Sequence, residues 1–152
     1  MAGHATMRES DRWSFALGLV DGMAWIDYIG MLSDVRRAVN MPPGLVPAAF
    51  LVADVGGVIV GRSSIRFRLD DWLAREGGHI GYGVLPAHRR KGYGTEILQQ
   101  SLVIARSQGI DPSLLCCDAD NVGSAAVIER CGGLLESTVD GDDGLVRRYW
   151  VS

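Results

Sequence analysis

Residues 84–95 read Val-Leu-Pro-Ala-His-Arg-Arg-Lys-Gly-Tyr-Gly-Thr and lie between an expected strand, His79–Leu85, and an expected helix, Tyr93–Gln108. Gly92 and Gly94 carry no side chain that would block an approaching ligand. The first turn of the helix presents backbone N–H groups without helical partners, at the positive end of the helix dipole. Three cations come just before it: Arg89, Arg90 and Lys91. The segment therefore predicts a cradle for an anion, best suited to a pyrophosphate.

Other interpretations of this loop compete with the cradle. A glycine-rich turn beside a solvated run of charge is the plainest one. The loop lacks the G-x-x-x-x-G-K-[ST] pattern of a P-loop, and Gly81-Tyr82-Gly83 falls inside the strand, so it does not fit the dinucleotide fingerprint. A nucleotide-binding protein is a weaker reading, because no magnesium ligand accompanies the loop.

The rest of the chain predicts an α/β (α+β) protein. Trp25, Tyr28 and Leu32 recur at helical spacing within an expected helix at 22–40, and Gly56-Gly57 predicts a tight hairpin. Hairpins and helix-linked strands occur together, so the sheet should be mixed. The further expected elements are a helix beginning at Ser10, strands at Ala48–Val55, Val58–Phe67, Leu114–Asp118, Leu134–Val139 and Leu145–Val151, and a helix at Gly123–Cys131.

Length and composition bound the class of protein. A chain of 152 residues predicts one domain, 1–152, with 1–9 as a loose arm and 10–40 helical. The net charge of −3 argues against nucleic-acid binding and against a polybasic membrane anchor. Three cysteines, two of them adjacent, do not fit a disulfide framework or a zinc site. No apolar run is long enough to span a membrane, and no signal peptide precedes the domain, so we expect a cytoplasmic protein.

Residues 45–152 resemble the GNAT superfamily of acyl-CoA-dependent N-acyltransferases. The pyrophosphate motif R-x-x-G-x-G/A of that family is matched by Arg89, Gly92 and Gly94, and its V-x-P by Val84 and Pro86. The resemblance implies a mostly antiparallel central sheet of six to seven strands, with helices on its flanks and a splayed strand pair that binds acyl-CoA. A family asparagine, followed by a short helix, is matched by Asn121 and Ser124.

The resemblance also implies which residues hold the cofactor. The backbone at Val84 would hold the pantetheine arm and polarise the thioester, and Asn121 would hydrogen-bond a pantetheine amide or form a turn. Ser124 would face the thiol or cap its helix. The implied cofactor-binding set is Val84, Leu85, Arg89, Arg90, Lys91, Gly92, Tyr93, Gly94, Thr95, Asn121 and Ser124.

The sequence departs from the family at two catalytic positions. The family places a glutamate five residues before the asparagine and a tyrosine seven residues after it, and here these positions are Cys116 and Ile128. A general base is still useful, because only about one alkyl amine in 2,500 is neutral at pH 7 and the neutral form attacks the thioester.

His79 is the first candidate for the base, since its ordinary pKa of about 6.5 suits the task. The competing interpretation is a structural histidine under the Gly77-Gly78 turn. Asp118 and Asp120 are the fallback bases. The predicted catalytic set consists of His79, Asp118 and Ser124, the last of which would face the thiol.

Several other side chains have two interpretations each. Tyr82 and Tyr149 are candidate proton donors or core residues, and Cys116 or Cys117 is a candidate acyl-cysteine or a small buried hydrophobe. The tryptophans that would line an acceptor pocket, or pack in the core, are Trp13, Trp25 and Trp72.

The leading hypothesis is an N-acetyltransferase that moves an acetyl group from acetyl-CoA to a primary amine of a small molecule or peptide, without a metal. A non-catalytic acyl-CoA-binding regulatory module is the alternative. A homodimer is compatible with the sequence.

Overall fold

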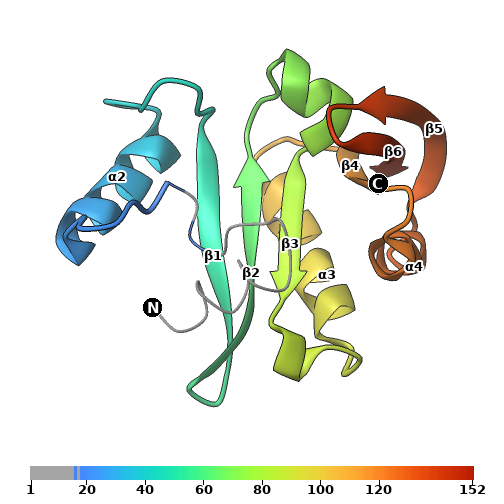
Figure 1. The fold of residues 1–152 in the computed structure, drawn as a ribbon, viewed down its shortest axis with the longest axis horizontal. Coiled ribbons are helices and arrows are strands. Elements are labelled where there is room, and N and C mark those ends of the chain that lie inside the picture. Colours follow the sequence, from blue (N-terminus) through green and yellow to red (C-terminus); the bar gives the residue numbers. More distant parts are fainter. Residues whose placement is uncertain (1–15, 17) are drawn as a thin grey trace.

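The computed structural model describes residue 16 and residues 18–152 (Figure 1). The helix expected at Ser10 and the side chain of Trp13 lie outside the described residues. The described elements are, in order, α2 (Trp25–Arg37), β1 (Ala48–Val55), β2 (Val58–Arg66), a π-helical turn (Leu73–Gly77), β3 (Ile80–Val84), a 3₁₀ turn (Pro86–His88), α3 (Tyr93–Ser107), β4 (Ser113–Asp118), α4 (Val122–Arg130), β5 (Leu134–Gly141) and β6 (Gly144–Val151).

Strands β1, β2 and β3 form an antiparallel sheet in that order. The predicted hairpin between β1 and β2 is confirmed. Gly56 and Gly57 both have positive φ angles, +61° and +84°, which suit glycine in a tight hairpin turn. The turn is closed by Asp54, whose Oδ1 accepts a hydrogen bond from the N–H of Gly57 at 2.9 Å.

Strands β4, β6 and β5 form a second antiparallel sheet in that order. The hairpin between β5 and β6 is tighter than the sequence pattern predicted. The loop expected at 140–144 is reduced because Asp140 pairs with Leu145, and Gly141 with Gly144. The second sheet therefore contributes three of the six strands in the described chain, within the six to seven expected.

The two sheets meet where β3 and β4 begin. The backbone N–H of His79 donates to the carbonyl of Leu114 at 2.7 Å, just before β3 starts. Beyond this point the two strands belong to separate sheets. We call the diverging parts of the two strands, 82–84 and 116–118, the split.

Helices α3 and α4 cover one face of the sheets, and α2 lies beside β1 (Figure 1). Leu98 and Leu102 of α3 pack in the same buried cluster as Ala125 and Ile128 of α4. Sheet residues that project to this face complete the cluster: Ile65, Ile80, Leu115, Cys117, Tyr149 and Val151. The core therefore holds α3 and α4 against the strands that form the split.

Between β2 and β3 lies a π-helical turn that the sequence did not predict. Arg75 and Trp72 donate hydrogen bonds to the carboxylate of Asp142 in the β5–β6 hairpin, at 2.8 and 3.2 Å. The carboxylate of Glu76 accepts from the backbone N–H of Asp142 at 2.9 Å. These contacts attach the segment that leads into His79 to the far hairpin.

Candidate active site

The loop after β3 presents backbone donors at the start of α3. Gly92 is the N-cap residue with φ +85°, a conformation that favours glycine, and its carbonyl accepts from Glu96 at 3.2 Å. The N–H groups of Tyr93, Gly94 and Thr95 belong to the first turn, where no helical acceptor exists. The predicted anion cradle therefore has its backbone donors in place.

The cations of this loop are arranged around the same backbone. Arg89 donates from Nε to the carbonyl oxygen of Val84 at 3.0 Å, and Lys91 donates from Nζ to the carbonyl oxygen of Ala87 at 3.2 Å. Arg90 has a positive φ of 62°. All three side chains are exposed, so an anion at the start of α3 would meet positive charge together with the helix dipole.

Backbone groups of β3 face the split. Arg66 donates to the carbonyl of His79, and Leu85 donates to the carbonyl of Val60, so odd-numbered residues of β3 pair with β2. Alternate residues of a strand point their N–H and C=O groups to opposite edges. The peptide groups of Tyr82 and Val84 consequently face the split.

Strand β4 has the matching arrangement. Ala119 donates to Leu145, which makes the odd-numbered residues of β4, including Leu115, the ones that pair with β6. The peptide groups of Cys116 and Asp118 therefore face the split from the other side. An extended ligand with amide groups would satisfy both edges as an additional strand does.

Gly94 lies between the split and α4. A Cβ atom at this position would be 3.7 Å from Val84, 3.8 Å from Tyr82 and 3.5 Å from Val127. These are ordinary van der Waals distances, so a methyl group fits here and a longer side chain would extend into the space between β3, α3 and α4. Gly94 therefore lies where the first turn of α3 meets β3 and α4.

Asn121 and Ser124 stand at the start of α4. Asn121 is the N-cap residue, and its Oδ1 accepts from the N–H of Ser124 at 3.0 Å. Ser124 is therefore not the cap of its own helix. Its Oγ lies 3.1 Å from the hydroxyl of Tyr82 instead.

The hydrogen bonding of His79 does not favour its predicted role as general base. That role stays a prediction. Its Nδ1 accepts a hydrogen bond from the backbone N–H of Leu114 at 2.9 Å, so the proton of the neutral ring is on Nε2. Burial, with a smaller effect of the positive charge on Arg66, lowers the pKa of His79 and keeps the ring neutral. The lone pair that a base would use already holds the junction of β3 and β4.

The two adjacent cysteines are poor nucleophiles. Burial raises the pKa of Cys116 to about 11, and the pKa of Cys117 to about 11 as well. Both are therefore thiols at neutral pH, and only the thiolate attacks a thioester. Ile128, at the family tyrosine position, is fully buried at 0% exposure. These two family positions thus carry no acid or base in this chain.

Asp118 and Asp120 are exposed carboxylates where β4 ends. Asp118 is the last residue of the strand, beside the split, and its carbonyl accepts from Asn121 at 3.0 Å. Asp120 follows in the turn before α4. Of the two fallback bases, Asp118 is the one that lies on a strand edge of the split.

The remaining aromatic candidates separate into core and surface. Tyr149 is fully buried, and its hydroxyl donates to Glu129 at 3.1 Å, which fits a packing role. Trp25 is 59% exposed and lies against Tyr28, with the ring centroids 5.3 Å apart. Trp72 is 50% exposed, so the core interpretation of these two described tryptophans is wrong.

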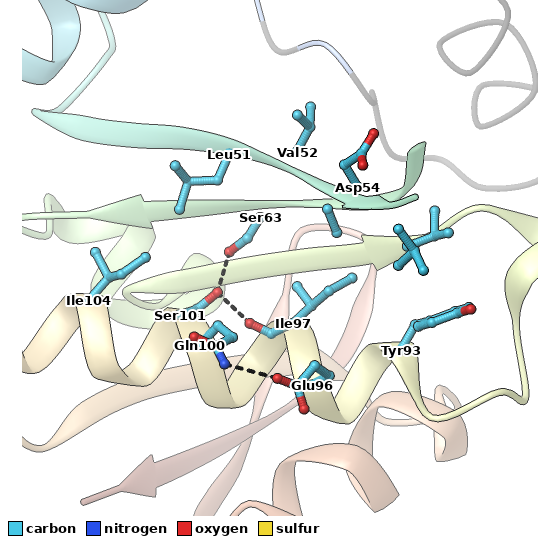
Figure 2. A pocket seen from close by; sticks show the side chains of 13 residues that line it. Leu51, Val52, Asp54, Ser63, Tyr93, Glu96, Ile97, Gln100, Ser101 and Ile104 are labelled. Carbon is cyan, nitrogen blue, oxygen red and sulfur yellow. Dashed lines mark hydrogen bonds between the residues drawn. The ribbon is translucent and has the colours of Figure 1, made fainter. Parts of the chain in front are cut away.

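A cavity of about 370 Å³ lies between α3 and the strands β1 and β2 (Figure 2). The side chain of Tyr93 lines it, so Tyr93 offers the cradle its backbone N–H and not its ring. The hydroxyls of Ser63 and Ser101 meet in its wall at 2.7 Å. Apolar side chains, including Leu51, Ile97 and Ile104, line it together with the polar residues Asp54, Glu96 and Gln100.

The described residues contain neither a membrane-spanning helix nor a cluster of metal-binding side chains. Within residues 18–152 no helix is long and apolar enough to cross a membrane. The same part of the chain contains no group of three or more side chains placed to hold a metal ion.

Comparison with known proteins agrees with this geometry. Residues 42–133 match the model of the acetyltransferase (GNAT) family. The chain is 28% identical over 130 residues to the uncharacterized N-acetyltransferase YfmK of Bacillus subtilis (strain 168), covering 84% of this chain and 76% of that protein.

Solved structures share the fold. A ribosomal-protein-alanine N-acetyltransferase from Brucella melitensis matches with a TM-score of 0.67 at 18% identity, over 98% of this chain and 91% of that one. The protein yncA of Salmonella typhimurium, solved with its cofactor acetyl-CoA, matches with a TM-score of 0.61 at 18% identity, over 98% and 82% of the two chains.

The interrupted sheet, the glycine loop and the start of α3 together define an acyltransferase of the GNAT type. The family match covers more than half of the sequence, and the chain belongs to the GNAT acetyltransferase family.

Proposed function

We propose that this protein transfers an acetyl group from acetyl-CoA to a primary amine of a small molecule or peptide, by direct attack of the amine on the thioester. The observation that carries the proposal is the split, whose diverged part lies next to the first turn of α3. A ligand with a diphosphate at one end and an amide-containing arm at the other matches both features at once.

The cofactor would be held mainly by backbone groups. The N–H groups of Tyr93, Gly94 and Thr95 would bind the diphosphate, each charge-assisted hydrogen bond adding roughly 1.5–3 kcal/mol. Arg89, Arg90 and Lys91 would add positive charge around it. The arm would then lie along the peptide groups that face the split, with the Asn121 side-chain amide on its α4 side.

The transfer itself needs a proton acceptor and a partner for the sulfur. We assign the acceptor role to Asp118, acting directly or through a water, because it ends the strand that borders the split. The amine nitrogen forms a bond to the acetyl carbon, the carbon–sulfur bond breaks, and the sulfur leaves with the electron pair. Ser124 would face that sulfur. A thiolate of pKa near 8.5 leaves with little help from an acid.

A non-catalytic acyl-CoA-binding module is the second candidate. The observation in its favour is that Cys116 and Ile128 occupy the two positions where the family usually has its glutamate and tyrosine. Such a module would bind acetyl-CoA through the same cradle and would not turn it over.

A panel of amines separates the two functions. Acetyl-CoA is incubated with the protein and with amino acids, polyamines, aminoglycosides and peptides with free N-termini, and the free thiol released is measured. Amine-dependent release that is lost in Gly94→Glu supports the enzyme. Binding of acetyl-CoA with no release above the hydrolysis background for any amine supports the module.

A further inference from the structure

The cavity between α3 and the strands β1 and β2 presents apolar surface from both layers (Figure 2). Leu51 points from β1 toward the helix, and Ile97 and Ile104 point from α3 toward the strands. The two isoleucines lie about two helical turns apart on one face of α3. Leu51 and Ile104 are only half-buried, so this surface is open to a ligand. No residue of the split lines the cavity, which makes it a separate place in the molecule.

Two buried hydroxyls in the cavity wall have a defined order of protons. The Oγ of Ser101 lies 2.7 Å from the carbonyl oxygen of Ile97, which can only accept, so Ser101 donates to it. The single proton of Ser101 is then used, and Ser63 must be the donor in the 2.7 Å contact between the two hydroxyls. Ser63 is 4% exposed and keeps a lone pair on its oxygen. The wall therefore offers a hydrogen-bond acceptor to the cavity.

Glu96 supplies negative charge at the mouth of the cavity. Its side chain is exposed, and its Oε1 accepts a hydrogen bond from Nε2 of Gln100 at 2.9 Å, one turn further along α3. The second carboxylate of the lining, that of Asp54, points away from α3 and closes the β1–β2 turn. None of the described residues that line the cavity is Lys, Arg or His. Apolar surface, a buried acceptor and a carboxylate at the mouth thus occur together.

We propose that this cavity binds an amphipathic amine, with its alkyl chain against Leu51, Ile97 and Ile104 and its ammonium group beside Glu96. An ammonium group has only donors, which suits a lining of acceptors and negative charge. A chain that ends in a carboxylate would instead meet Glu96 with like charge. Tyr93 and Glu96 belong to the first turn of α3, so the bound amine would lie against the helix that carries the cradle. The site is additional to the acyl-CoA site and does not depend on the proposed function.

Titration of the ¹⁵N-labelled chain with n-hexylamine, followed through the amide chemical shifts, tests the proposal. At pH 7 the amine is protonated, and saturable shifts should map to the lining residues of β1, β2 and α3. Affinity should rise from butylamine to hexylamine by up to about fourfold for each methylene that becomes buried. 1-Hexanol, which has the same chain without the charge, should bind about 2–5-fold more weakly, and hexanoate more weakly still.

Four variants locate the two ends of the ligand. Glu96→Gln should weaken hexylamine about 2–5-fold and bring it close to hexanol. Asp27→Asn is the matched control, because Asp27 is the first-turn acid of α2, away from the cavity, and it should bind as the parent does. Ala53→Leu places a larger side chain on the strand face of Leu51 and should abolish binding of the whole series. Gly94→Glu, which obstructs the cradle, should bind hexylamine with parent affinity.

Three results would overturn the inference. Equal affinities of hexylamine and hexanol in the parent would make the cavity a site for neutral apolar molecules. Loss of hexylamine binding in Gly94→Glu would place the amine at the acyl-CoA site, and parent-like binding in Ala53→Leu would place it outside the cavity. Failure of the parent to bind CoA is a separate result, because it contradicts the proposed function and leaves the amine titration as it is.

Discussion

His79 and Leu114 exchange two hydrogen bonds at the junction of the sheets. The backbone N–H of Leu114 donates to Nδ1 of the imidazole at 2.9 Å, and the backbone N–H of His79 donates to the carbonyl of Leu114 at 2.7 Å. The ring thus completes the strand pairing at the point where β3 and β4 diverge. We therefore interpret His79 as the residue that fixes the closed end of the split.

Replacement of His79 by alanine should destabilise the fold more than it slows transfer. The variant leaves the N–H of Leu114 without its acceptor, and the free energy of unfolding should fall by about 1–3 kcal/mol. Urea unfolding measures this, with His88→Ala, on the surface loop, as the control. Turnover reduced 10²-fold or more in a variant of normal stability would instead restore His79 as the base.

The same ring predicts a pH dependence of stability. Burial, and then the charge of Arg66, lower the pKa of His79 in the folded chain, whereas the unfolded chain has the ordinary value of about 6.5. Below pH 6.5 the unfolded state therefore binds more protons, and the contribution of His79 is lost as the pH falls through the lowered pKa. Unfolding midpoints between pH 7.5 and 5 should decline more steeply for the parent than for His79→Gln. Parallel curves would show that the ring is not held neutral.

Gly92 and Gly109 provide a matched pair at the two ends of α3. Both have positive φ, +85° and +79°, and a Cβ at either position would meet no atom within 4 Å. Alanine should therefore cost each variant a similar strain, about 1–2 kcal/mol. Calorimetry with CoA should reveal weaker binding in Gly92→Ala and parent-like binding in Gly109→Ala. Equal affinities would mean that the backbone at Gly92 does not shape the cradle.

Asp118→Asn tests the proton acceptor. The amide cannot take a proton from the amine, so turnover should fall about 10²–10⁴-fold. Affinity for acetyl-CoA should stay near the parent value, because the carboxylate would serve the amine. Asp120→Asn, two residues later in the turn, is the control and should retain activity. If Asp118→Asn turns over at the parent rate, the base lies elsewhere.

The sequence predicted the features that depend on neighbouring residues. The hairpin at Gly56-Gly57 and the start of α3 at Tyr93 follow from glycine and from helix periodicity, and both are local in the chain. The strands were predicted to within a few residues for the same reason. The π-helical turn at Leu73–Gly77 was missed, because five residues are too few to establish a period.

The sequence could not predict which distant groups meet. The acceptor Nδ1 of His79 and its donor Leu114 are 35 residues apart, and Tyr82 and Ser124 are 42 residues apart. Whether a ring at the start of a strand faces a ligand or a neighbouring strand changes with a shift of one residue. The interpretation of His79 as a base required the ring to face the ligand. The contact with Leu114 places the ring against the neighbouring strand β4 instead.

The cradle makes a further prediction about Gly94, whose neighbours leave room for a methyl group at 3.5–3.8 Å. Gly94→Glu should fold, and its carboxylate should exclude the diphosphate by charge and by volume. Gly30→Glu is the control, since a Cβ on Gly30 in α2 would meet nothing within 4 Å.

The most direct test of the account is the melting temperature of the chain with and without CoA. At 100 times the dissociation constant, a ligand of the folded state adds about 2.7 kcal/mol. For a domain of this size the parent and Gly30→Glu should then melt about 5–10 °C higher, and Gly94→Glu should not shift. No shift of the parent at millimolar CoA, or an equal shift in Gly94→Glu, would contradict the assignment of this loop and split as the acyl-CoA site.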